Sequence, residues 1–92
     1  MLDEILQRMR AKITAQLYVM TMHAEVEMED EGLTRYDSEQ GILTGKILER
    51  QKDRLTSESK YRIRGEIAGG GEVEIIAKLS SGKVVIITVY VL

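Results

Sequence analysis

The sequence of 92 residues contains no cysteine, no proline, no phenylalanine and no tryptophan. Without cysteine there is neither a disulfide nor a thiolate metal site, which fits a reducing compartment. Without Phe or Trp the core must be aliphatic, helped by five methionines and four tyrosines. No apolar run approaches the length of a membrane span, and the first residues are not those of a signal peptide. We therefore expect a single cytoplasmic domain over residues 1–92 that makes no membrane contact.

Charge is unevenly distributed along the chain, although the net charge is only −2. Residues 1–33 hold seven acids and three bases, whereas residues 46–64 hold seven bases and three acids. The bases of this second stretch are Lys46, Arg50, Lys52, Arg54, Lys60, Arg62 and Arg64. A basic strip on a mildly acidic protein suits a polyanion such as RNA, and a solvated charged surface is the alternative interpretation.

The C-terminal third predicts three antiparallel strands joined by tight turns. Side chains of residues 61–67 alternate between apolar and polar, with the period of two that a strand requires. Residues 73–79 alternate less cleanly, because Ile76 falls on the face of Glu74 and Lys78. Residues 84–91 are apolar on both faces, so we expect this strand to lie centrally in the sheet. Gly69-Gly70-Gly71 and Ser81-Gly82 can supply the positive-φ residues that hairpin turns need.

The N-terminal half predicts helices. Apolar residues at helical spacing across residues 2–14, with acids in the first turn and bases later, indicate an amphipathic helix. Thr21 is typical of an N-cap and Gly32 of a C-cap, so they bound a second helix. A third helix ends at Gly45 and should be short, because Gly41 in its interior weakens it by about 1 kcal/mol relative to Ala. Its N-cap is Thr34, Asp37 or Ser38.

Two further segments complete the predicted fold. Residues 17–20 form either a brief strand or a continuation of the first helix, and residues 46–53 can add a charged strand at the edge of the sheet. The fold class is therefore α+β. Two to three N-terminal helices pack on a small antiparallel sheet, which consists of a three-stranded C-terminal meander with that edge strand as an addition.

One row of polar side chains on the second helix contains residue types that bind metal ions. His23, Glu27 and Glu31 are spaced four residues apart and therefore stack along one face. A single His with carboxylates, lacking a second His or Cys, is a weak metal site. A solvated acidic face explains the row better, and we expect no metal and no other cofactor.

Six short motifs along the chain point to one family. They are Thr21-Met22-His23-Ala24, Gly32-Leu33, Ile42-Leu43-Thr44-Gly45, Glu49-Arg50-Gln51, Lys60-Tyr61-Arg62-Ile63-Arg64-Gly65 and Ile87-Thr88-Val89-Tyr90. Over roughly residues 18–91 the chain resembles an uncharacterised bacterial and cyanobacterial domain-of-unknown-function family, whose members are similar to RelE/ParE-like toxins. Residues 21–33 are also similar to the motility quorum-sensing regulator toxins, ribonucleases that cleave messenger RNA and are neutralised by a zinc-finger antitoxin.

The resemblance implies a function as well as a fold. The chain would be the toxin of a type II toxin–antitoxin pair, with metal-independent endoribonuclease activity and a RelE-like architecture. Its partner would be a cognate antitoxin of the zinc-finger or helix-turn-helix type. A homodimer formed by β-augmentation belongs to the alternative of a non-catalytic protein-binding module. RelE-type toxins use several Lys and Arg residues with a C-terminal Tyr. The residues that match here are Arg50, Arg62, Arg64, Lys78 and Tyr90.

Metal-free cleavage of RNA by the 2′-hydroxyl needs a proton acceptor, cations that stabilise the phosphorane, and an acid for the leaving oxygen. The candidate catalytic residues are His23, Arg62, Arg64, Lys78 and Tyr90. His23 is the only histidine and the natural base or acid. The two arginines share a strand face and can grip phosphates, and Tyr90 can bond a phosphate or stack on a base. Candidate RNA-binding residues are Lys46, Arg50, Lys52, Arg54 and Lys60.

Structural roles are the alternatives for these residues. His23 can bond Glu27, the arginines can pair with Glu66 and Glu74 across the hairpin, and Tyr90 can belong to the core.

Three acids depart from the family pattern. Many members carry Arg at the position of Glu27 and often a basic residue at that of Glu31, and the quorum-sensing regulator toxins have Tyr where this chain has Glu74. An acid at position 74 would repel phosphate. The alternative functions are a non-catalytic protein-binding module that pairs a sheet edge with its partner, and RNA binding without cleavage.

Overall fold

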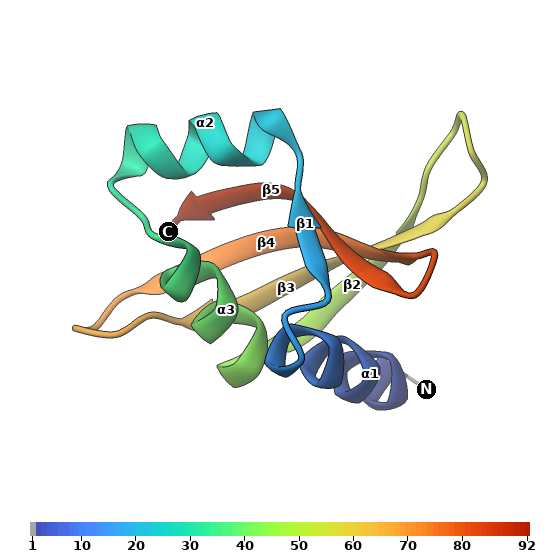
Figure 1. Ribbon diagram of the computed structural model, residues 1–92, viewed down its shortest axis with the longest axis horizontal. Helices are drawn as coiled ribbons and strands as arrows, with labels where there is room; N and C mark the ends of the chain where they lie inside the picture. Colours follow the sequence, from blue (N-terminus) through green and yellow to red (C-terminus); the bar gives the residue numbers. More distant parts are fainter. Residues whose placement is uncertain (1) are drawn as a thin grey trace.

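A computed structural model describes residues 2–92, and over these residues the chain forms three helices and a five-stranded sheet (Figure 1). The elements in chain order are α1 (Leu2–Thr14), β1 (Tyr18–Met20), α2 (Met22–Glu31), α3 (Arg35–Thr44), β2 (Lys46–Lys52), β3 (Ser59–Glu66), β4 (Glu72–Ser80) and β5 (Lys83–Val91). The α+β class and the edge strand β2 are as predicted. The described sheet has one strand more than predicted, because the short segment after α1 forms β1.

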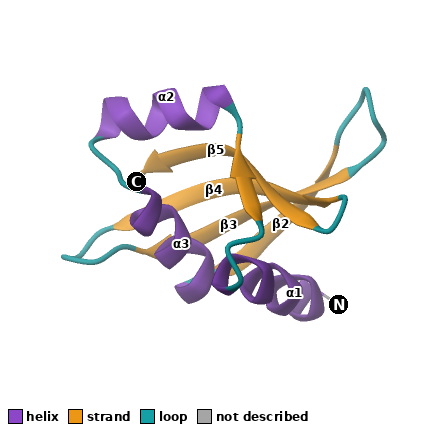
Figure 2. Ribbon diagram, viewed as in Figure 1, coloured by secondary structure: helices purple, strands orange, loops and turns teal. Residues whose placement is uncertain are grey.

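The strands lie in the order β1-β5-β4-β3-β2. β2 to β5 are antiparallel neighbours, while β1 pairs in parallel with β5 over three residues. The strand predicted to be central, β5, is an interior strand with a neighbour on each side, and β4 occupies the middle of the sheet. Beyond the end of β1, helix α2 runs along β5 and takes the place of a longer edge strand (Figure 2).

The core lies between the sheet and the helices. α1 and α3 pack on one face, here called the helix face, and α2 packs along the β5 edge (Figure 1). The fully buried aliphatic side chains of the strands point to this face. They are Ile63, Val73, Ile75, Ala77, Val84, Ile86 and Val89. The opposite face, here called the open face, is covered by no helix of residues 2–92 and presents polar side chains.

The predicted helix ends are largely confirmed. Thr21 accepts a hydrogen bond from the amide of Ala24, and Gly32 ends α2 with φ of 69°. Of the three candidates for the next N-cap, Thr34 forms a capping box with Asp37, and α3 runs for 10 residues despite its interior glycine. Gly45 ends α3 in an extended conformation rather than a left-handed one.

The carbonyl groups at the C-terminal end of α3 accept hydrogen bonds from a side chain of α1. Arg10 of α1 donates from Nη2 to the carbonyl of Gly45 at 2.6 Å and from Nε to that of Ile42 at 3.3 Å. These bonds replace the ones that a left-handed glycine would make at a helix C-terminus.

Two glycines allow α3 to sit directly on the sheet. A Cβ on Gly65 would overlap the carbonyl oxygen of Gly41, and a Cβ on Gly41 would come within 2.7 Å of side-chain carbons of Val73 and Ile75. The glycine that weakens an isolated helix is therefore the residue that permits its tertiary contact.

No helix within residues 2–92 combines the length and the apolarity that crossing a membrane requires.

The Gly65 contact generates a stability prediction. Gly65→Ala should lower the free energy of unfolding by about 3 kcal/mol or more. The new methyl group would overlap the backbone of Gly41, which cannot change rotamer as a side chain can. Gly70→Ala is the control: nothing lies within 4 Å of its added Cβ, and only its φ of 90° is strained, a cost of about 1–2 kcal/mol. Urea unfolding measures both, and equal losses would contradict the close contact.

Candidate functional site

The open face has a buried carboxylate at its centre. Glu74 on β4 is only 4% exposed. Its Oε1 accepts hydrogen bonds from Arg62 Nη1 at 3.1 Å and from the Tyr90 hydroxyl at 2.5 Å, and its Oε2 accepts one from Arg64 Nη2 at 3.1 Å. These four residues, here called the Glu74 cluster, come from three neighbouring strands. A buried charge held by three donors, on a face that no helix of the described residues covers, is a candidate site for a polar ligand.

The strand register explains why the cluster forms. Arg64 pairs with Glu74, and Glu74 pairs with Tyr90, so the three side chains project side by side from the same face. Arg62 lies two residues from Arg64 along β3 and reaches the carboxylate diagonally. A bulge in β2 places Glu49 opposite Arg62, and Glu49 Oε1 accepts from Arg62 Nε at 3.2 Å.

The electrostatics of the cluster favour an ionised Glu74. The hydrogen bond from Tyr90, and then those from Arg64 and Arg62, hold the pKa of Glu74 below its ordinary value of 4.5, against the opposing effect of burial. The same bond to Glu74, followed by burial, raises the pKa of Tyr90 above 10.0. At neutral pH the cluster thus combines a carboxylate, two guanidinium groups and a neutral phenol. It can accept a proton, donate a hydrogen bond and stabilise negative charge.

Lys78 lies on the same face of β4, four residues after Glu74. Its Nζ donates to Glu58 Oε1 at 2.9 Å, and this bond lowers the pKa of Glu58. Lys78 therefore shares the open face with the Glu74 cluster but is bonded to an acid in the turn before β3.

The predicted basic strip is divided between the two faces of the sheet. Lys46 pairs with Arg64, and Lys60 lies two residues from Arg62 on β3, so both point to the open face. Arg50 pairs with Tyr61 and Lys52 pairs with Ser59, which places both on the helix face. Arg54 lies in the turn between β2 and β3. The open face therefore gathers only part of the strip.

His23 is not part of the Glu74 cluster. It lies at the start of α2 with 68% of its side chain exposed, and its Nε2 is 3.4 Å from Glu27 Oε2. Glu27 Oε1 accepts a hydrogen bond from the amide of Val89, on the edge of β5 beyond β1. Glu27 therefore satisfies an edge amide, while Glu31 lies at the end of α2. Within residues 2–92 no three His, Asp or Glu side chains are placed to hold a metal ion.

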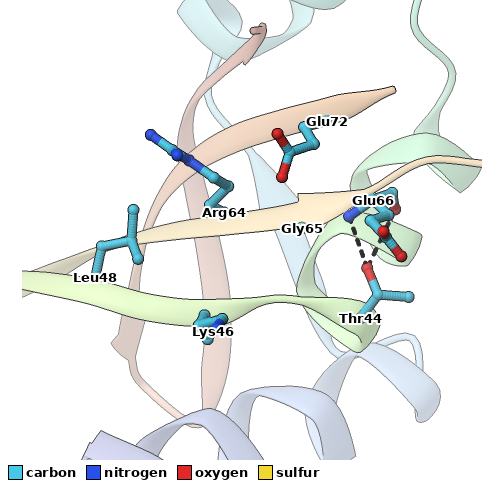
Figure 3. Close-up of a pocket in the computed structure, with 7 residues that line it drawn as sticks. All are labelled: Thr44, Lys46, Leu48, Arg64, Gly65, Glu66 and Glu72. Carbon is cyan, nitrogen blue, oxygen red and sulfur yellow. Dashed lines mark hydrogen bonds between the residues drawn. The ribbon is translucent and has the colours of Figure 1, made fainter. Parts of the chain in front are cut away.

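A pocket of about 460 Å³ adjoins the Glu74 cluster on the open face. Its lining residues are Thr44, Lys46, Leu48, Arg64, Gly65, Glu66 and Glu72 (Figure 3). It is called the Gly65 pocket here, after the residue between Arg64 and Glu66 on β3. Because Arg64 both lines the pocket and bonds Glu74, the pocket and the cluster are neighbours on one surface.

Three acids of this surface were not predicted as site residues: Glu66, Glu72 and Glu74. The signal in the sequence for Glu74 is an acid flanked by Val73 and Ile75 in the middle of an apolar strand. With two arginines alternating on the preceding strand, such an acid indicates a buried ion cluster, and its effect on a phosphate depends on the donors around it.

Comparison with known proteins identifies a family. Residues 20–91 match the family described as Domain of unknown function (DUF4258), which is most of the chain, so the protein belongs to this family. The chain matches no curated protein and no solved structure. The predicted domain-of-unknown-function family is thus confirmed, and helix α1 precedes the matched segment.

The buried carboxylate generates a pH prediction. Because the folded-state pKa of Glu74 lies below 4.5, its contribution to stability is complete above that pH and disappears as the pH falls through the folded-state pKa. Glu74→Gln should cost about 2 kcal/mol at pH 7, where two arginines lose their anion, and should flatten the loss of stability in acid.

Urea unfolding of wild type and variant at pH 7 and pH 3 measures both effects. Glu29→Gln, at an exposed acid on α2, is the control and should behave as wild type. A Glu74→Gln curve that falls as steeply with acid as the wild-type curve would contradict the role of Glu74.

Proposed function

We propose that the protein is a metal-independent endoribonuclease of RelE-like architecture, the toxin of a type II toxin–antitoxin pair, and that the Glu74 cluster is its catalytic site. The supporting observation is the convergence of Arg62, Arg64 and Tyr90 on one ionised carboxylate, on a face that no helix of residues 2–92 covers. This set contains each group that cleavage by the 2′-hydroxyl requires.

The proposed reaction assigns a role to each member. Glu74 accepts the proton of the attacking 2′-hydroxyl, and a bond forms between the 2′-oxygen and phosphorus. Arg62 and Arg64 stabilise the charge that develops on the phosphate oxygens. The bond from phosphorus to the 5′-oxygen breaks as that oxygen takes the Tyr90 proton, which leaves a 2′,3′-cyclic phosphate. Glu74 then returns a proton to Tyr90 across their 2.5 Å hydrogen bond, so both groups recover their starting states.

Substrate binding itself would make Glu74 a better base. A guanidinium has five N–H donors, and the side chains of Arg62 and Arg64 are 29% and 42% exposed. A phosphate that binds these donors competes with Glu74 for them and adds a negative charge beside it. Both effects raise the proton affinity of the carboxylate towards the range in which general bases work well. An acid at this position therefore supports cleavage in the proposed mechanism.

His23 has no role in this mechanism. Its contact is to Glu27, which in turn holds the Val89 amide. Lys78 lies on the same face as the Glu74 cluster. It would contact an adjoining phosphate of the RNA if its bond to Glu58 were replaced by a bond to that phosphate.

A protein-binding module without catalysis is the second candidate function. It is favoured by the free edge of β2, where Leu48 is 40% exposed and where a strand of a partner can add to the sheet. The same edge would serve a cognate antitoxin in the first candidate function.

Cleavage assays test the catalytic site. Arg64→Ala and Tyr90→Phe should each slow the cleavage of a single-stranded RNA by about 100-fold, since each removes a group used in the transition state. Arg8→Ala changes an exposed arginine of α1 and should cleave at the wild-type rate. The assay contains EDTA, and thermal unfolding confirms that each variant is folded.

Growth gives a second readout of the same variants. Induction of the wild type in a bacterium without the partner should arrest growth, and Tyr90→Phe expressed at equal level should not. Full cleavage activity in both Arg64→Ala and Tyr90→Phe would refute the proposed site. A folded wild type that neither cuts RNA nor arrests growth would favour the protein-binding module.

The division of the basic strip predicts how salt affects RNA binding. Each lysine that contacts a phosphate steepens the fall of log affinity with log salt by about 0.7 for a single strand. Lys60→Ala, on the open face, should reduce this slope by about that amount. Lys52→Ala removes the same charge from the helix face and should leave the slope unchanged. Fluorescence anisotropy with a labelled RNA measures both slopes, and the reverse order would place RNA on the other face.

A further inference from the structure

The Gly65 pocket is a distinct feature of the open face that the proposed catalytic step does not use. Its volume of about 460 Å³ lies within the range of pockets that hold small organic ligands, roughly 300–1,000 Å³. Arg64 connects it to the Glu74 cluster, because this residue lines the pocket and its Nη2 bonds Glu74. A ligand that extends from the cluster along this surface would therefore enter the pocket.

The charges of the pocket are arranged in pairs across the strands. Lys46 and Arg64 face each other across β2 and β3, and Glu66 and Glu72 face each other across β3 and β4. Like charges directly opposite each other are unfavourable. Neither of these two carboxylates forms an ion pair with another side chain of residues 2–92. The arrangement suits a ligand that offers hydrogen-bond donors to the carboxylates and an acceptor to the cations.

The walls of the pocket are held in place by the fold. Thr44 Oγ1 donates to the carbonyl of Gln40 at 2.7 Å and accepts from the amide of Glu66 at 2.8 Å, which joins the end of α3 to the end of β3 (Figure 3). The backbone of Gly65 is fixed by its contact with Gly41 on the helix side. Leu48 adds an apolar side chain to the lining. The pocket thus combines an apolar wall with polar groups of both signs.

We propose that the Gly65 pocket binds the guanine base of the RNA nucleotide that adjoins the cleaved phosphate. The inference deepens the proposed ribonuclease function and rests on it for the placement of the phosphate. Guanine offers two adjacent donors, N1–H and the N2 amino group, and a carboxylate accepts two parallel N–H bonds. Its O6 and N7 accept from Lys or Arg, here Lys46. Leu48 would contact the flat face of the base.

The other bases fit these groups less well. Adenine and cytosine present one amino group beside a ring nitrogen acceptor, which a carboxylate repels, and uracil presents one N–H between two carbonyl groups. Guanine is the base that satisfies a carboxylate and a cation together. The pocket would therefore select guanine, while the Glu74 cluster would act on any phosphate.

Nucleotide binding tests the pocket without requiring cleavage. We expect guanosine monophosphate to bind at least about tenfold more tightly than the adenosine, cytidine and uridine monophosphates, the discrimination that one good bidentate pair provides. Titration of the ¹⁵N-labelled protein gives the dissociation constants and shows which amides shift. The Glu66→Gln/Glu72→Gln double variant should lose the preference for guanine. The matched control Glu29→Gln, on α2, should keep it.

The outcomes separate this inference from the ribonuclease. Equal binding of the four nucleotides, or shifts that avoid residues 44–48, 64–66 and 72, would overturn the guanine pocket even if RNA is cleaved. Selective guanosine monophosphate binding, lost in the double variant, would support the pocket even if no RNA is cut, in which case the cleavage proposal fails alone. If both hold, cleavage sites should adjoin guanine in the wild type and lose that preference in the double variant.

Discussion

The burial of the Glu74 carboxylate is the constraint on which the sheet depends. An ionised group that is 4% exposed is stable only when its oxygens receive hydrogen bonds. Here the donors come from β3 and β5, on either side of β4. A shift of one residue in either pairing would turn a donor strand's polar side chains to the helix face and leave the charge without partners. The cluster therefore favours one register of β3, β4 and β5.

Strand β3 links this surface to the helices. On its open face it carries Arg62 and Arg64, and on its helix face Gly65 meets Gly41 of α3. The close contact lets the helix rest on the strand that holds the arginines, so the packing of the core positions the site. It also places the end of α3 beside the Gly65 pocket, where Thr44 bonds the backbone of Glu66. The packing of α3 on β3 thus contributes both to the core and to the lining of the pocket.

Local features of the fold could be predicted because their causes lie within a few residues. The periodicity of α1, the caps Thr21 and Gly32, and the alternation of β3 and β4 each depend on neighbours in the sequence. The sequence left open whether residues 17–20 form a strand or continue the first helix. Three residues are too few to show the periodicity of a strand, and the partner of β1, β5, is more than 60 residues away in the sequence. The close packing of Gly41 against β3 and β4 could not be predicted either. From the sequence of the helix alone, only the unfavourable helix propensity of glycine is known.

By itself, the sequence determined the α+β class, the caps Thr21 and Gly32 of α2, the aliphatic core and the family to which residues 20–91 belong. It also placed Arg62 and Arg64 on one strand face, because alternation is a local property. Only the tertiary structure decided that both arginines and Tyr90 meet at Glu74, that Lys60 and Lys52 lie on opposite faces, and that His23 lies with Glu27 instead. These outcomes depend on strand pairing and bulges, where one inserted residue reverses the face of every side chain that follows.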